Sequence, residues 1–249
     1  MTDSLGFRLK LGIIAPSTNT TVQPEMDDMR PRGVTNHFGR VYIPDDPIHN
    51  DEDFGRLMTN IRASMDDAAR VIMTCGPDRL VLGMSSETFW DGLDGSRRLM
   101  KRMAHIAGGK PVTMGSDAVL EALKHYGNVK RIAVVTPYQP VGEAQVLRFF
   151  NDAGFEVLAV NGMKGTSPVQ YAHFSERQIR DAILRVDSAS VDAIVQVGTN
   201  LAAARVAGMA EFWLDKPVLA INTAIYWHAL RNSGINDRIS GFGSLLLNH

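Results

Sequence analysis

DRLVLGMSSETFW at residues 78–90 and DAIVQVGTNLAAA at residues 192–204 are the stretches that decide the fold. Each begins with an Asp, runs through a short apolar segment typical of a buried parallel strand, and breaks into small polar residues before helix-forming sequence resumes. We interpret them as equivalent strand–loop–helix units, one in each half of a duplicated chain. This interpretation predicts a site between residues 84–86 and residues 198–200.

The rest of the chain alternates strand-like and helix-like segments. Strands are expected at 10–16, 34–43, 78–84, 110–114 and 131–137, and helices after Pro24, over 51–75 and over 93–107. This alternation predicts an α/β protein with parallel sheets.

Three sequence blocks recur in the same order. RIAVVTP at 131–137 repeats LGIIAP at 11–16, the DAIV block repeats the DRLV block, and KPV at 216–218 repeats KPV at 110–112. An ordered set of repeats indicates duplication. We therefore expect two similar Rossmann-like lobes related by a pseudo-twofold axis. Residues 1–115 form the first lobe and 116–221 the second, with 222–249 as a segment that can cross back to the first.

Composition limits the function. The chain has 249 residues, 45% of them hydrophobic, a formal charge of −1, and no basic run interleaved with aromatic residues. Nucleic acid and membrane surfaces are therefore not expected partners. The apolar segments are too short to span a bilayer and the first ten residues lack a signal-peptide core, so we expect a cytoplasmic protein. The single cysteine, Cys75, excludes an intramolecular disulfide, and the histidines show no metal-ligand spacing.

Polar residues follow several predicted strands, and ligands bind at the carboxyl ends of parallel strands. Hydroxyls, amides and backbone N–H groups with little fixed charge suit a carboxylate or a developing oxyanion. Each Ser, Thr or Asn after a strand is also a candidate helix N-cap. The residues expected around one pocket are Ser17, Thr18, Asn19, Ser85, Ser86, Tyr138, Thr199 and Asn200.

A family resemblance rests on APSTNTTVQPE at 15–25, GMSSETFW at 83–90, Tyr138, VGTNL at 197–201 and GFGSLL at 241–246. Together these resemble the aspartate/glutamate racemase superfamily, and most closely the branch containing maleate cis-trans isomerase and arylmalonate decarboxylase. The resemblance implies two Rossmann-like lobes, no metal or organic cofactor, and a small carboxylate that becomes an enediolate between the lobes. It also implies a homo-oligomer, either a dimer or a tetramer.

The resemblance implies a role for individual residues. Asn19 matches a carboxylate-binding asparagine, Ser85 and Ser86 match a Thr/Ser pair that holds the substrate carboxylate, and Tyr138 matches a tyrosine that binds it. The catalytic candidates are therefore Tyr138, Ser85 and Ser86. The substrate-binding candidates are Ser17, Thr18, Asn19, Met84, Gly198, Thr199, Asn200 and Thr166.

The chain departs from the family at its centre. Met84 and Gly198 stand where the isomerases and racemases have cysteines, and Gly198 stands where the decarboxylase has its one cysteine. Cys75 precedes its strand and is expected at the opposite end, as a small buried structural residue. Chemistry that needs a thiolate is therefore not expected. The glycine is expected to leave space for a bulkier substrate or for a water.

The leading hypothesis is a cofactor-independent, cysteine-independent lyase or hydrolase acting on a small carboxylate, for which an aromatic group is one option. An enolate or oxyanion forms between the lobes, and Tyr138 is the best acid or base. One alternative is an enzyme like arylmalonate decarboxylase or maleate isomerase. Another is a non-catalytic sensor or accessory protein that binds a carboxylate.

Other candidates have simpler interpretations. Glu87 is a candidate general base, but a Glu in a first helical turn is favoured by the helix dipole. His228 is expected at a helix surface or core edge. Phe89-Trp90 and Tyr226-Trp227 are expected to pack lobe against lobe, or to form an aromatic wall beside the pocket.

Overall fold

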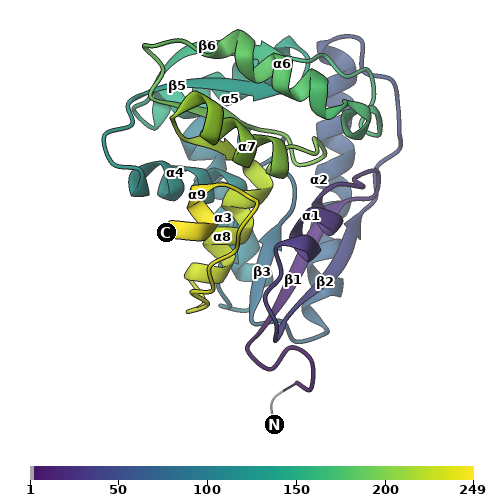
Figure 1. Cartoon of the computed structure of the whole chain (residues 1–249). Helices are drawn as coiled ribbons and strands as arrows, with labels where there is room; N and C mark the ends of the chain where they lie inside the picture. The colour runs from purple at the N-terminus through teal and green to yellow at the C-terminus, as the bar shows by residue number, and fades with distance from the viewer. Residues whose placement is uncertain (1–2) are drawn as a thin grey trace.

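The computed structural model of the protein describes residues 3–249, in which two four-stranded sheets have parallel strands throughout (Figure 1). The first sheet has the order β2-β1-β3-β4 and contains β1 (Leu9–Pro16), β2 (Val34–Val41), β3 (Arg79–Leu82) and β4 (Val112–Thr113). The second has the order β6-β5-β7-β8 and contains β5 (Arg131–Thr136), β6 (Glu156–Gly162), β7 (Ala193–Gln196) and β8 (Val218–Ala220). The same strand order in both sheets confirms the predicted two-lobed α/β fold.

The strand registers also match between the lobes. In the first lobe β1 pairs with β3 from Leu11↔Arg79 onward, and in the second β5 pairs with β7 from Ile132↔Ala193 onward. These pairs are equivalent when LGIIAP is aligned with IAVVTP and DRLVL with DAIVQ. The repeated blocks therefore occupy equivalent positions in the two sheets.

The Asp that opens each block has the same role in both lobes. The N–H of Asp78 donates to the Lys10 carbonyl at 2.8 Å, and the Asp78 carboxylate accepts the Lys10 N–H at 2.8 Å. The N–H of Asp192 donates to the Arg131 carbonyl at 2.7 Å, and its carboxylate accepts the Arg131 N–H at 2.8 Å. Each Asp therefore fixes the start of one strand against its neighbour, which explains why both blocks begin with this residue.

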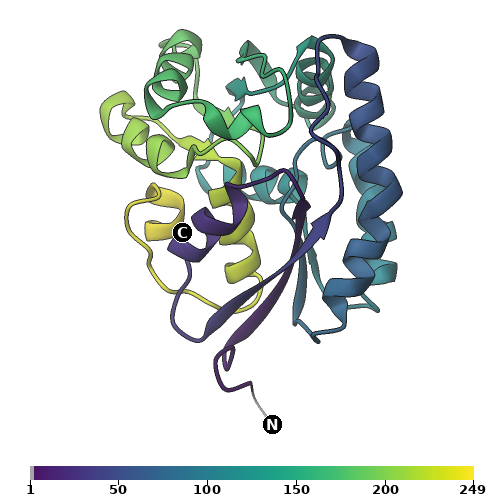
Figure 2. The same ribbon diagram turned by 90° about the vertical axis from the view of Figure 1, so that its right-hand side faces the viewer.

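The helices lie on both faces of the sheets. They are α1 (Val22–Asp28), α2 (Asp51–Met73), α3 (Gly92–Ile106), α4 (Gly115–His125), α5 (Pro140–Asp152), α6 (Glu176–Val186), α7 (Ala204–Leu214), α8 (Ile221–Arg231) and α9 (Ser244–Asn248), with a short 3₁₀ helix η1 (Gln170–His173). Figure 2 shows α2 along one face of the first sheet, with α1 and α8 on the other face.

Element boundaries differ slightly from expectation. The helix expected after Pro24 begins at Val22 because the side-chain oxygen Oδ1 of Asn19 accepts the N–H groups of Thr21 and Val22. Pro24 lies in the first turn, where its missing N–H removes no helical hydrogen bond. The strand expected over 34–43 ends at Val41, and the helix expected over 51–75 ends at Met73.

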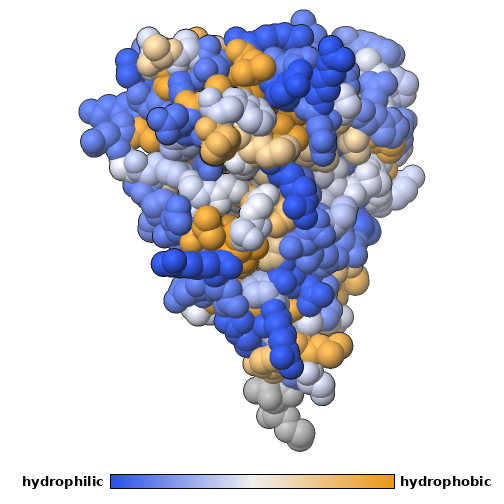
Figure 3. Space-filling view, viewed as in Figure 1, coloured by the Kyte–Doolittle hydropathy of each residue, from blue (hydrophilic) through white to orange (hydrophobic). Residues whose placement is uncertain are grey.

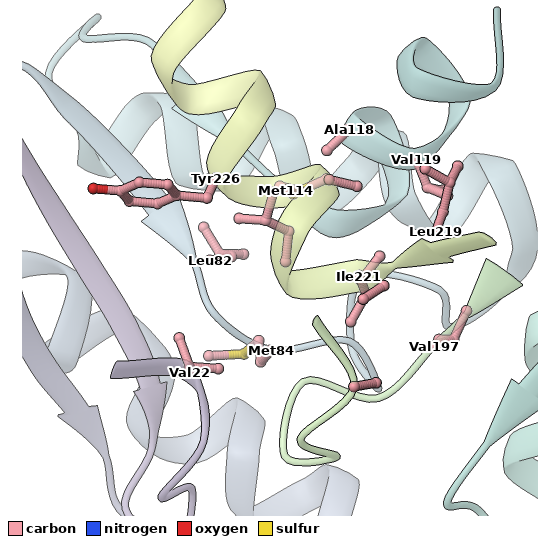
Figure 4. Packing of buried hydrophobic residues seen from close by; sticks show 14 of the residues in the cluster. Val22, Leu82, Met84, Met114, Ala118, Val119, Val197, Leu219, Ile221 and Tyr226 are labelled. Atoms are coloured by element: carbon pink, nitrogen blue, oxygen red, sulfur yellow. The ribbon is translucent and has the colours of Figure 1, made fainter. Parts of the chain in front are cut away.

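Helix α8 is the most deeply enclosed helix of the chain. Every residue from Ile221 to Leu230 is buried, although the helix follows a strand of the second lobe. It contacts α1, β3 and β4, which belong to the first lobe, and it appears among core side chains in Figure 4. A crossing back of the C-terminal segment is consistent with these contacts, while the lobe boundaries in sequence stay a prediction.

The face of the molecule seen in Figure 3 is mainly hydrophilic. On the face in Figure 3 the apolar residues form small groups separated by polar ones. Within residues 3–249, no helix has both the length and the apolar character that crossing a membrane would need.

Candidate active site

A small cavity lies where β1, β3, β5 and β7 end. The cavity has a volume of about 40 Å³, counted as the space that the centre of a water molecule can reach. Nine of the eleven predicted site residues line it: Thr18, Asn19, Met84, Ser85, Ser86, Tyr138, Gly198, Thr199 and Asn200. The two polar loops of the duplicated units, residues 84–86 and 198–200, therefore lie at one cavity.

Two predicted site residues do not line the cavity. Ser17 is exposed, and its hydroxyl donates to the Ile43 carbonyl at 3.1 Å and accepts the Ile43 N–H at 3.0 Å. Thr166 is also exposed, and its hydroxyl donates to Gln170 at 2.7 Å. Both hydroxyls are thus used in local loop structure, and neither residue is among those lining the cavity.

Several lining residues were not predicted. They are Pro16, Ile43, Leu57, Ile61, Pro168 and Tyr171. Leu57 and Ile61 lie one turn apart on α2, where their helical spacing is the same as that of ordinary core residues. One wall of the cavity is therefore apolar, and helical periodicity alone would not separate it from the core.

The predicted amides and Thr199 bridge the lobes. Asn19 Nδ2 donates to Thr199 Oγ1 at 3.2 Å, and Thr199 Oγ1 donates to the Gly83 carbonyl at 3.2 Å. Asn200 Oδ1 accepts the Thr20 N–H at 3.0 Å, and Asn200 Nδ2 donates to the Pro168 carbonyl at 2.9 Å. Three of these four hydrogen bonds join the two lobes, and the bond from Asn200 to Pro168 lies within the second lobe. These polar groups are therefore used to build the cavity and are not free to bind a ligand.

The free donors are backbone groups. After β3 the last ladder bond is from Gly83 N–H to the Ile14 carbonyl, at 2.8 Å. After β7 the equivalent bond is from Val197 N–H to the Val135 carbonyl, at 2.9 Å. Among the described residues, the N–H groups at positions 85, 86, 199 and 200 then have no acceptor. The N–H groups at 84, 87, 88 and 198 have no acceptor within residues 3–249 either. Buried backbone N–H groups are normally paired, so a run of unpaired groups in each loop indicates a place for an anion or polar ligand.

Hydroxyl groups add to these donors. The Ser85 and Tyr171 hydroxyls are buried. The Tyr171 hydroxyl has no hydrogen-bond partner in the described chain, and the Ser85 hydroxyl lies beside the Tyr138 phenol. The Tyr138 and Tyr171 rings meet edge to face with centroids 5.8 Å apart. Burial, and secondarily the nearby Tyr171, raises the pKa of Tyr138, which the Ser85 hydroxyl lowers by less, and burial raises the pKa of Tyr171. Both phenols are therefore neutral near pH 7 and act as donors.

Among the described residues, tyrosines are the only ionisable side chains lining the cavity. Over residues 3–249, no group of three or more His, Cys, Asp or Glu side chains is arranged to hold a metal ion.

Met84 and Gly198 fill the two central positions differently. Met84 is buried beside Val22 (Figure 4). Gly198 has φ +125°, and a Cβ atom there would lie 2.4 Å from Pro137 Cδ. A side chain at 198 would thus run into Pro137 and not into the cavity. The expectation that this glycine leaves space for substrate or water is not supported.

Cys75 lies outside the cavity lining, in the turn between α2 and β3, while Met84 follows the other end of β3. Its thiol donates to the Ile72 carbonyl at 3.1 Å. The expectation that it is buried was wrong, because the residue is exposed. The turn that ends α2 leaves the side chain at the surface.

Two other candidates are held by structural contacts. The Glu87 carboxylate accepts two hydrogen bonds from Arg62 Nε, at 2.9 and 3.0 Å, and burial raises its pKa. His228 contacts Thr113 Oγ1 at 3.0 Å and Glu121 at 3.2 Å, and burial lowers its pKa. Neither residue lines the cavity.

The four aromatic residues of the two predicted pairs pack on different partners. Phe89 packs edge to face on Phe149 of α5, with centroids 4.7 Å apart, so it joins the lobes as expected. Trp90 stacks on Phe54 of α2 at 5.7 Å. The Tyr226 hydroxyl donates to Asn36 of β2 at 3.1 Å, and Trp227 packs on His125 of α4 at 5.0 Å.

Comparison with known proteins agrees with this geometry. The maleate isomerase of Pseudomonas putida is 25% identical over 253 residues, which cover 95% of this chain and 96% of that protein. A structure of Nocardia farcinica maleate cis-trans isomerase, a cysteine-to-serine mutant with a covalently bound succinylcysteine intermediate, has a TM-score of 0.87 at 21% identity and covers 97% of this chain and 99% of its own. A structure of arylmalonate decarboxylase has a TM-score of 0.74 at 21% identity and covers 95% of this chain and 98% of its own.

The family described as arylmalonate decarboxylase matches residues 11–246, a range that includes seven of the eight strands in full, most of β1, and every residue lining the cavity. Since the match spans almost the whole sequence, this chain belongs to the arylmalonate decarboxylase family.

Proposed function

We propose that this chain is a lyase that decarboxylates a small malonate-type dicarboxylate without a cofactor and without a cysteine. The observation that carries the proposal is the set of uncharged donors around the cavity, to which both lobes contribute. These are the unpaired N–H groups at 85, 86, 199 and 200 and the hydroxyls of Ser85, Tyr138 and Tyr171. Preorganised donors of this kind stabilise negative charge that develops on oxygen.

In the proposed reaction the bond between the α-carbon and one carboxylate breaks, and that carboxylate leaves as carbon dioxide. The electron pair of the broken bond passes through the α-carbon into the remaining carboxylate, which becomes an enediolate. The donors around the cavity stabilise its two oxygens. A proton from a hydroxyl of the site or from water then bonds to the α-carbon, and solvent water replaces that proton. The product is a monocarboxylate.

The apolar wall supports the direction of this reaction. Ile43, Leu57 and Ile61 offer no hydrogen bond to an ionised carboxylate. A charged group against such a wall loses hydration without compensation, which raises its free energy. Loss of carbon dioxide removes the charge from the apolar side and moves it toward the donors.

The two tyrosines fit the role of donors. Burial raises the pKa of Tyr138, so its phenol keeps its proton near pH 7. A neutral phenol donates a hydrogen bond or a proton but is not a general base. We therefore assign Tyr138 to oxyanion stabilisation or proton delivery, and not to the base role that the sequence left open.

Two of the other functions considered, cysteine-dependent isomerisation and hydrolysis, need groups that the cavity lining lacks. The Nocardia farcinica isomerase carries a succinylcysteine intermediate, whereas no cysteine of the described chain lines this cavity. Hydrolysis needs an activated water, and within residues 3–249 no carboxylate or histidine lines this cavity to act as its base. A sensor remains chemically consistent, because the same donors would bind a carboxylate without turnover.

Product formation tests the proposal. Malonate, phenylmalonate and maleate are each incubated with the protein in D₂O, and carbon dioxide and products are followed by mass spectrometry and NMR. Decarboxylation should give a monocarboxylate with deuterium at the α-carbon, and Ser85→Ala should slow it by about 10²- to 10³-fold. Conversion of maleate to fumarate would instead support isomerisation. Thermal stabilisation by these acids with no product would favour a sensor.

A further inference from the structure

The carboxylate of Glu25, on α1 of the first lobe, accepts hydrogen bonds from α7 and α8. Its Oε1 accepts the Ala204 N–H at 2.9 Å, and its Oε2 accepts Asn222 Nδ2 at 2.6 Å. Ala204 is the first residue of α7, and the residue before it, Ala203, provides no side-chain cap. A carboxylate from another lobe therefore takes the place of the N-cap at this helix start.

Asn222 connects Glu25 to the loop at the cavity. Its Nδ2 donates to the Thr199 carbonyl at 2.9 Å as well as to Glu25. The side chain is 1% exposed, and its Oδ1 has no partner in the described chain. The opposite amide orientation would place Oδ1 against two acceptors, so Glu25 and the Thr199 carbonyl together fix the amide.

The Thr199 carbonyl and the Asn200 N–H belong to one peptide unit. In a planar trans peptide these two groups point to opposite sides, and no cis peptide occurs in the described residues. Holding the carbonyl on Asn222 directs the Asn200 N–H the other way. That N–H has no acceptor among residues 3–249, and its residue lines the cavity.

We propose that Glu25 is a positioning residue that acts through Asn222 to aim the Asn200 N–H at the substrate oxygen. Its effect on turnover rests on the proposed function, but the peptide orientation is a property of the ligand-free protein.

The charge on Glu25 gives this contact a pH dependence. Burial is the main cause that raises the pKa of Glu25 to about 7. Asp28 on its own helix raises this pKa further, and Arg205 of α7 lowers it. Asp28 and Arg205 pair with each other at 2.9 Å. Together with Glu25 and Glu176 of α6, they line a second cavity at the outer side of α1. An ionised carboxylate accepts both hydrogen bonds, whereas a protonated one carries a hydrogen on one of the two oxygens.

Nuclear magnetic resonance of the ligand-free protein tests the orientation without needing turnover. The backbone amide of Asn200 is followed in ¹⁵N-labelled wild type, Glu25→Gln and Glu176→Gln from pH 5.5 to 8.5. In the wild type and in Glu176→Gln its resonance should shift with a midpoint near pH 7. In Glu25→Gln this titration should be absent. A wild-type Asn200 resonance that does not titrate near pH 7 would refute the proposal even if the variant failed to fold.

Kinetics add a second, separable readout. Glu25→Gln should lower kcat toward the substrate by about 10²-fold, as loss of one aimed donor does, with a smaller change in KM. Glu176→Gln should leave both unchanged. If no malonate is turned over, the affinity for malonate is measured by calorimetry in place of kcat. Failure of the proposed reaction is then distinguishable from failure of this proposal. Unchanged kcat and affinity in a folded Glu25→Gln protein would overturn it.

Discussion

Asn19 Nδ2, from the first lobe, donates to Thr199 Oγ1, from the second, at 3.2 Å at the edge of the cavity. Asn19 Oδ1 also accepts the N–H groups of Thr21 and Val22 at 3.0 and 2.9 Å. One side chain therefore starts α1 and joins the lobes. A residue that family resemblance assigns to carboxylate binding is used structurally here.

Asn19→Ala should lower the free energy of unfolding by about 2–3 kcal/mol, because a helix cap and a buried interlobe hydrogen bond are both lost. Urea unfolding measures this change. Thr20→Ala is the control, since this neighbour is exposed and its side chain makes no hydrogen bond within the described chain, and it should stay within about 0.5 kcal/mol of wild type. Equal stability of the two variants would show that Asn19 does not join the lobes.

Tyr171→Phe should separate stability from binding. The Tyr171 hydroxyl is buried without a partner among residues 3–249, so its removal should leave the protein as stable as wild type or more stable by about 1 kcal/mol. Affinity for a carboxylate ligand should fall because one donor is lost. Thermal unfolding with and without malonate measures both effects. A variant that keeps wild-type affinity would show that this hydroxyl does not contact the ligand.

Gly198→Ala should destabilise the protein by more than the cost of backbone strain alone, which is about 1–3 kcal/mol. A Cβ there would lie 2.4 Å from Pro137 Cδ, in addition to the strain of φ +125°. Gly154→Ala is the control, because this glycine also has positive φ, +88°, but a Cβ on it would meet no heavy atom of the described chain within 4 Å. Chemical denaturation of both variants isolates the clash. Equal destabilisation would mean that Pro137 moves away at little cost.

Alkylation of Cys75 should leave the site intact. The thiol is exposed and does not line the cavity, so iodoacetamide should modify it in the folded protein without changing carboxylate binding or turnover. Mass spectrometry counts the modification and calorimetry measures binding on the same sample. Loss of binding after alkylation of a protein that remains folded would place the thiol in the mechanism.

Much of the fold follows from the sequence because its repeated blocks are continuous strands with their loops. The Asp at the start of each block and the apolar run after it fix the same register in both lobes. Nine site residues could be predicted for the same reason, since loops after equivalent strands meet at one place. Tyr171 could not, because it lies on a short 3₁₀ helix far from any repeated block. The hydrogen bonds of Asn200 and Thr199 between the lobes could not be predicted either. The residue type alone does not distinguish a polar side chain that binds a ligand from one that binds a main-chain carbonyl.

The stability contributed by Glu25 should fall as pH rises from about 4.5 to about 7. Its pKa is raised from 4.5 to about 7 in the folded protein, so over this range the folded state keeps a proton that the unfolded state has lost. Linkage then makes the free energy of unfolding decrease with pH, by on the order of 3 kcal/mol across the window. Carboxylates with lowered pKa, such as Asp53 and Asp237, lose their contributions only below their usual value of 3.8. His228 and Glu87 titrate alike in wild type and variant, so comparison with Glu25→Gln removes their contribution. Urea unfolding of wild type and Glu25→Gln at half-unit intervals from pH 4.5 to 8 measures the difference between them. The free energy of unfolding of the wild type, minus that of Glu25→Gln, should decrease steadily up to pH 7 and then level off. A difference that stays constant would mean that Glu25 does not titrate in this range.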